Sequence, residues 1–166
     1  CSCEEGVYGM TVVAYDAVTP GLTTYRFYVD MVHGDDRMSA VFGNSDWFMN
    51  INAPMGAYNN AGNTSWNASG LSTAFLAVFP ELADDSFATI GLTGPASESD
   101  IAGAADPSVV EDQNQLITPF FLEDGATILA STTSVGASWF VLNSNDNGLP
   151  IAQGKVLIMA LTTPAM

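Results

Sequence analysis

The residues of this sequence that could carry acid–base or nucleophilic chemistry are few and poorly grouped. His33 is the one histidine of the chain, and so the one side chain suited to carry protons near neutral pH. Asp35, Asp36 and Ser39 follow it closely, but the Gly-x-Ser-x-Gly turn that exposes a nucleophilic serine does not occur in the chain. Because His33 precedes Gly34, it is typical of a turn residue. We therefore expect His33 to be dispensable and the protein not to be an enzyme.

Paired acidic residues are the second chemical feature. Two carboxylates about 5–9 Å apart in a cleft can hydrolyse a glycosidic bond. Each pair here falls at a predicted turn, where Asp begins turns and stays solvated. This placement favours a structural role over a hydrolase for all four pairs: Asp35-Asp36, Asp84-Asp85, Glu111-Asp112 and Glu123-Asp124.

Calcium is the one cofactor that the sequence brings into consideration. The run from Asn143 to Gly148 imitates the alternating start of a calcium loop, with a glycine at the sixth position. Gly154 stands where such a loop would carry its bidentate glutamate, and a plain turn between two strands explains the run equally well. The candidate ligands are Asn143, Asn145, Asp146 and Asn147.

Aromatic residues beside a long polar loop point to sugar binding. Trp47, Tyr58 and Trp66 lie in or next to the stretch 58–70, and exposed aromatic faces can stack on sugar rings. The alternative for Trp66 is a loop anchor that packs onto the fold. Trp139, within an apolar run, is expected in the core.

The two cysteines of the chain, Cys1 and Cys3, are too close for an unstrained bridge to each other. An inter-chain disulfide is one interpretation. The others are an unpaired tail and a lipidated Cys1 of a bacterial surface lipoprotein.

Composition restricts the partners. The chain has 166 residues, 48% of them hydrophobic, and carries 18 acidic against three basic residues, for a net charge of −15. Nucleic acids and anionic lipids need Lys and Arg, so both are excluded as partners. No apolar run approaches the roughly 20 residues that a membrane-spanning helix requires. A Lys-poor, acidic chain of this kind is typical of secreted proteins, so we expect an extracellular or cell-surface location.

The elements that must position these side chains are predicted to be strands. Apolar residues alternate with polar ones in 23–33 and again in 138–143, the period of half-buried strands. Further strands are expected at 7–18 and 115–122. The pattern predicts an all-β domain, a single sandwich of about nine to ten strands that is jelly-roll-like or Greek-key. We expect a tail at 1–6, the sandwich at 7–163, and a linker or tail at 164–166.

Four stretches resemble a β module that recurs in very large secreted or surface proteins of marine and aquatic microbes. They are Thr23–Val29, Met38–Gly43, Asp85–Leu92 and Trp139–Asn143, in the same order as in that module. The resemblance implies an extracellular building block that occurs in tandem or in assemblies. It implies no activity and no functional residues.

These observations favour a structural or adhesive module that acts by self-association into a surface fibre, layer or tandem array. Its partners would be copies of itself or neighbouring modules. Val7–Val13 and Gly154–Thr163 are apolar and free of acidic residues, so either could pair with a neighbour if it lay at a sheet edge. The alternative is a carbohydrate-binding or calcium-dependent adhesion module with glycans as partners.

Overall fold

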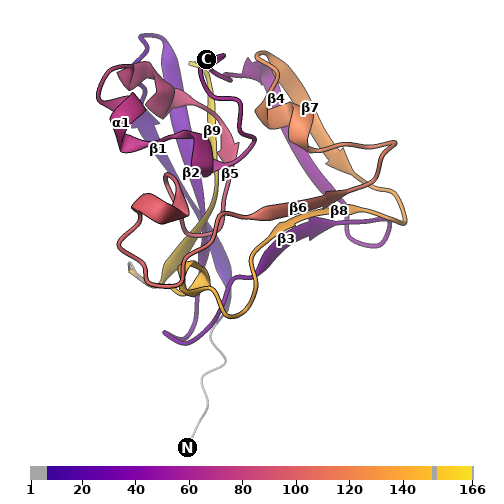
Figure 1. The fold of residues 1–166 in the computed structure, drawn as a ribbon. Helices are drawn as coiled ribbons and strands as arrows, with labels where there is room; N and C mark the ends of the chain where they lie inside the picture. The colour runs from indigo at the N-terminus through magenta and orange to yellow at the C-terminus, as the bar shows by residue number, and fades with distance from the viewer. Residues whose placement is uncertain (1–6, 151–152, 166) are drawn as a thin grey trace, which may run out of the picture.

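The computed structural model describes residues 7–150 and 153–165, and within them the chain is built mainly of β-structure (Figure 1). Nine strands lie in these ranges: β1 (Gly9–Asp16), β2 (Leu22–Asp30), β3 (Ala40–Gly43), β4 (Met49–Ala57), β5 (Phe87–Ala88), β6 (Ser108–Glu111), β7 (Ala126–Ser131), β8 (Ala137–Phe140) and β9 (Lys155–Pro164). The helices there are α1 (Thr73–Leu76) and the 3₁₀ helices η1 (Ala68–Gly70), η2 (Pro80–Asp84), η3 (Ala96–Glu98), η4 (Thr118–Phe121) and η5 (Asp146–Gly148). The prediction of an all-β fold is confirmed.

The strands form three antiparallel sheets. One has four strands in the order β1-β2-β9-β5, one has three in the order β3-β8-β6, and β4 pairs with β7. Three of the strand pairs are nested along the chain: β4·β7 lies between β3 and β8, and β3·β8 lies between β2 and β9. Figure 1 shows the four-stranded sheet facing the two smaller ones in a sandwich-like layout that remains open.

The main core lies between these layers and is centred on Trp139. Its ring is 1% exposed, and its indole Nε1–H donates to the carbonyl oxygen of Thr89 at 3.2 Å. Phe121 meets the Trp139 ring edge-on, with centroids 6.1 Å apart. A buried indole with its N–H satisfied contributes both apolar area and a fixed orientation.

A second apolar cluster lies on the outer face of the four-stranded sheet. Leu157 and Ala160 of β9 pack there against Phe87 and Leu82, with Leu76 of α1 lying over them. Val156 and Ile158 of the same strand belong to the main core. β9 is thus buried on both faces, which explains its nearly unbroken apolar run.

The structure decides one open alternative about the strands and overturns one prediction. Of the two apolar segments that could have lain at a sheet edge, residues 154–163 do not, because β9 is paired with β2 on one side and with β5 on the other. The strand predicted at 115–122 is largely replaced by η4, which has Pro119 in its first turn. Proline fixes a helical φ and lacks the N–H that a ladder needs, so it favours a helix start over a central strand.

Candidate functional site

An apolar cleft lies between the four-stranded sheet and the opposite layer. Its volume is about 490 Å³. Phe27, Ile158 and Leu161 line it from the four-stranded sheet, and Ile51 and Trp139 line it from the opposite layer. None of the acidic or basic residues that the structure describes lines this cleft. It is a neutral surface on a protein of net charge −15.

The rim of the cleft exposes large apolar side chains. Met10 of β1 is 62% exposed, and Phe42 and Phe48 on the other side are 58% and 69% exposed. β9 is buried and β2 is half-buried, whereas six of the eight residues of β1 are exposed. A contiguous exposed apolar surface of this kind commonly marks an interaction site.

The basic residues lie elsewhere and are engaged within the chain. Arg37 pairs with Asp146 at 3.1 Å, and Lys155 pairs with Asp30 at 3.4 Å. Arg26 lies over the ring of Tyr15, 5.1 Å from its centroid. All three basic residues therefore have partners inside the molecule, and the remaining surface is acidic or neutral.

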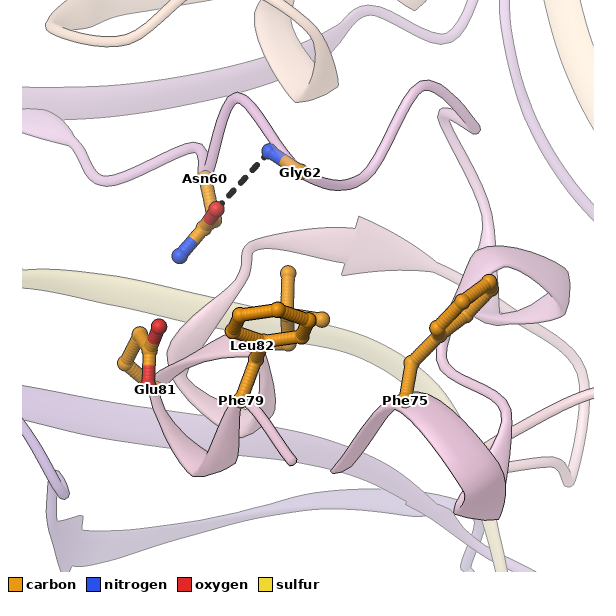
Figure 2. A pocket seen from close by; sticks show the side chains of 6 residues that line it. All are labelled: Asn60, Gly62, Phe75, Phe79, Glu81 and Leu82. Atoms are coloured by element: carbon orange, nitrogen blue, oxygen red, sulfur yellow. Dashed lines mark hydrogen bonds between the residues drawn. The ribbon is translucent and has the colours of Figure 1, made fainter. Parts of the chain in front are cut away.

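A smaller pocket of about 220 Å³ lies beside α1 (Figure 2). Phe75 and Phe79 are 58% and 51% exposed and stand one helical turn apart, with buried Leu82 below them. Asn60 lines the opposite wall, and its Oδ1 accepts a hydrogen bond from the Gly62 N–H at 2.8 Å. Glu81 contributes a carboxylate at one side.

A buried acidic pair holds the loops around this pocket. Asp85 is 1% exposed, and its carboxylate accepts hydrogen bonds from the Asn60 N–H and from the Asn63 side-chain amide, each at 2.6 Å. Burial raises the pKa of Asp85 to about 7, against the lowering effect of these two donors. Its neighbour Asp84 is also buried and accepts from the N–H groups of Val18 and Thr19. The expectation that this pair stays solvated at a turn is wrong, because N–H groups from a distant loop take the place of water around each carboxylate.

The other acidic pairs also accept hydrogen bonds. Asp124 accepts from the distant Asn59 N–H, and Asp112 accepts from the nearby Asn114 N–H but is buried, so the expectation of a solvated residue is wrong for Asp112 too. Asp36 accepts from the N–H groups of Val32 and His33, and these bonds lower its pKa. Glu111 accepts from Thr118 and from the N–H of Ile117 at the start of η4. These acids organise turns, and none of them lines the apolar cleft.

Three of the four predicted calcium ligands are engaged with the protein, and Asn143 is exposed. Asp146 pairs with Arg37, and the Oδ1 of Asn145 accepts from the Leu142 N–H. Asn147 is fully buried; its Oδ1 accepts from Ala105 N–H and its amide donates to two carbonyls. These oxygen ligands do not fit Ca²⁺. The one carboxylate, that of Asp146, is paired with Arg37, and two of the three amide oxygens already accept backbone hydrogen bonds. Across the described ranges, no three His, Cys, Asp or Glu side chains gather as a metal site would require.

The three aromatic residues predicted to bind sugar do not form one platform. Trp47 precedes β4 and Tyr58 follows it, so the two lie at opposite ends of that strand. Trp66 packs against the main core, as its alternative interpretation has it. Phe75 and Phe79 form an aromatic pocket that the sequence reasoning missed, although their i, i+4 spacing was a readable signal.

The remaining candidates are the two cysteines and His33. Cys1 and Cys3 lie outside the described residues. His33 is exposed in a turn, where its carbonyl accepts from the Asp36 N–H. No helix in the described part of the chain is long and apolar enough to cross a membrane.

Comparison with protein families, curated proteins and solved structures finds no match to this chain. The resemblance to a marine and aquatic surface module therefore stays a prediction.

Proposed function

We propose that this chain is a non-enzymatic, extracellular structural or adhesive module that acts by associating with copies of itself. The observation that carries the proposal is the neutral apolar cleft with its exposed rim of Met10, Phe42 and Phe48. Charged residues are depleted at the centre of protein interfaces, and apolar and aromatic residues are enriched there. On this chain the cleft and the adjoining β1 combine both properties.

Self-association has to overcome repulsion between copies that each carry a net charge of −15. At low ionic strength this repulsion extends over tens of ångströms. At about half-molar salt the Debye length falls to about 4 Å, and short-range apolar contacts can then prevail. We therefore expect association to strengthen as salt is added, whereas a complex held by ion pairs would weaken.

The extracellular location and the tandem or layered arrangement rest on the acidic, Lys-poor composition and on the resemblance described above. In such an arrangement each module supplies a rigid β-domain and a neutral contact surface. Nothing in this role requires a reactive side chain.

Sedimentation velocity of the full chain, at low salt and at half-molar salt, tests the proposal. We expect a monomer at low salt and a larger species at high salt. Phe48→Ser removes an exposed rim side chain and should weaken the association. Leu142→Ser is the matched control, because Leu142 is similarly exposed, at 65% against 69%, but lies outside the cleft. A chain that stays monomeric at every salt concentration would refute the proposal.

The Phe75–Phe79 pocket supports a second candidate, carbohydrate binding. Two exposed rings can stack on a sugar, while Asn60 and Glu81 can bond its hydroxyls. Titration calorimetry with soluble neutral polysaccharides tests it. Phe79→Ala should abolish binding, whereas Phe42→Ala, an equally exposed phenylalanine at the cleft, should not; equal binding by both variants would reject this site.

A further inference from the structure

We infer that two copies of this chain join through antiparallel pairing of their β1 strands about a two-fold axis. The two four-stranded sheets then become one continuous sheet. The inference rests on the proposed self-association and specifies the contact that produces it.

β1 is an edge strand without the usual protection. It pairs with β2 over all eight residues from Gly9 to Asp16, with no register shift, and the described chain places no strand on its other side. Natural edge strands are commonly blocked by lysine, proline or a bulge. The stretch 9–15 contains no charged residue and no proline. Its outer backbone N–H and C=O groups are thus available to a further strand.

The side chains of β1 also lack cover. Met10 is 62% exposed, Val12 is 48% exposed and Tyr15 is 44% exposed. Met10 lines the apolar cleft, and Val12 shares its face because side chains alternate along a strand. A second β1 laid alongside would bring another Met10 and Val12 to this face, so the floor of the cleft would continue across the junction.

The chain itself is the occupant that fits this edge. A partner strand must carry no acidic residue, since it approaches a protein of net charge −15, and it must be exposed before binding. Residues 9–15 meet both conditions in every copy. Pairing of two β1 strands would also bury the exposed side chains of Met10, Val12 and Tyr15 on both copies, which adds apolar area to the backbone hydrogen bonds of the junction.

The geometry of a two-fold axis restricts the register. An axis perpendicular to the sheet keeps the same face of both strands together, so a residue on the axis opposes its own copy. An axis at Val12 pairs Met10 with Ala14 of the second copy and places Asp16 beyond the central pairs, opposite Tyr8. An axis at Val13 would set Asp16 against Met10 instead. We assign the axis to Val12 because this register keeps the Asp16 carboxylate at the end of the paired segment, away from Met10.

Such a contact is isologous and closes after two copies. A fibre or layer would need a second contact or a covalent tandem linkage in addition. β1 pairing therefore accounts for a dimeric unit of the assembly.

The test uses single cysteines in the full chain with Cys1 and Cys3 changed to Ser. Under mild oxidation at half-molar salt, Val12→Cys should cross-link into a dimer, since antiparallel neighbours have Cα atoms within disulfide range. Met10→Cys on the same strand should cross-link poorly with itself but readily with Ala14→Cys in a mixture. Ile128→Cys, on an exposed position of β7 at 64%, is the control outside the interface.

Val12→Lys supplies the second measurement. The side chain is half-exposed, so the domain should fold with an unchanged circular-dichroism spectrum, while sedimentation at half-molar salt shows loss of the dimer; Ile128→Lys should retain it. If Val12→Lys associates like the parent chain and Val12→Cys does not cross-link, β1 pairing is refuted while self-association stands. If the parent chain never associates, both proposals fail.

Discussion

The carboxylate of buried Asp85 accepts a 2.6 Å hydrogen bond from the backbone N–H of Asn60, which is half-buried and lies 25 residues away along the chain. No basic side chain is paired with this carboxylate in the described chain. The polar loop that carries Asn60 and Gly62, one wall of the Phe75–Phe79 pocket, is therefore attached to the fold through an acid whose charged form is disfavoured by burial.

Asp85 should make stability depend on pH near neutrality. Burial raises its pKa from 3.8 to about 7. The folded state thus holds this proton more tightly than the unfolded chain. The stabilising contribution is fully present below about pH 4 and is lost as pH rises through about 7.

Urea unfolding at pH 5 and pH 8 measures this effect. From this group alone, we expect the free energy of unfolding to fall by an amount on the order of 2 kcal/mol between the two values. Asp85→Asn, which cannot ionise, should flatten the dependence, and Asp46→Asn on the surface is the control. An unchanged pH dependence in Asp85→Asn would contradict the assignment.

Truncation should cost much more stability at Trp139 than at Trp47. Trp139→Ala leaves a cavity and an unpaired Thr89 carbonyl in the core, so it should cost about 3–5 kcal/mol of unfolding free energy. Trp47→Ala removes a side chain that is 72% exposed and should change stability by less than about 0.5 kcal/mol. Chemical denaturation followed by circular dichroism compares them, and similar losses for both would be inconsistent with this core.

Asn147 should matter for stability rather than for metal binding. Its side chain makes three hydrogen bonds, to Ile90 and Ala105, and is fully buried. Asn147→Ala leaves these backbone groups without a hydrogen-bond partner and should destabilise the fold by about 2–4 kcal/mol. Asn143→Ala, at an exposed position of the same loop, should have little effect. Equal melting temperatures for the two variants would exclude this role.

Calcium should leave the protein unchanged. A ligand that binds only the folded state stabilises it by RT ln(1 + L/Kd), where L is the free ligand concentration, and so raises the melting temperature. Because the oxygens of Asn145, Asp146 and Asn147 already bond within the chain, we expect the same melting temperature in millimolar calcium and in chelator. A calcium-dependent rise that Asp146→Asn abolishes would restore the metal site.

Local pattern was sufficient to predict the strand content. Alternation from Tyr25 to Met31 predicts β2 because a strand with one face toward a core needs an apolar residue at every second position. The tight turns were readable for a similar reason, since glycine, asparagine and aspartate adopt turn geometry independently of distant contacts. Both are properties of residues close together in sequence.

The partners of each strand and the fate of each polar side chain depended on the tertiary structure. Residues 9–15 and 154–163 look alike in sequence, yet β9 lies between two strands and β1 lies at an edge. Asp84 and Asp85 read as a solvated turn like the other acidic pairs, but donors from Val18 and Asn60 replace water around them. Composition determined the net charge and local alternation the class of fold, because these are summed or local properties. Edges, clefts and buried acids arise only when segments far apart in the chain meet, and folding decides which of them do.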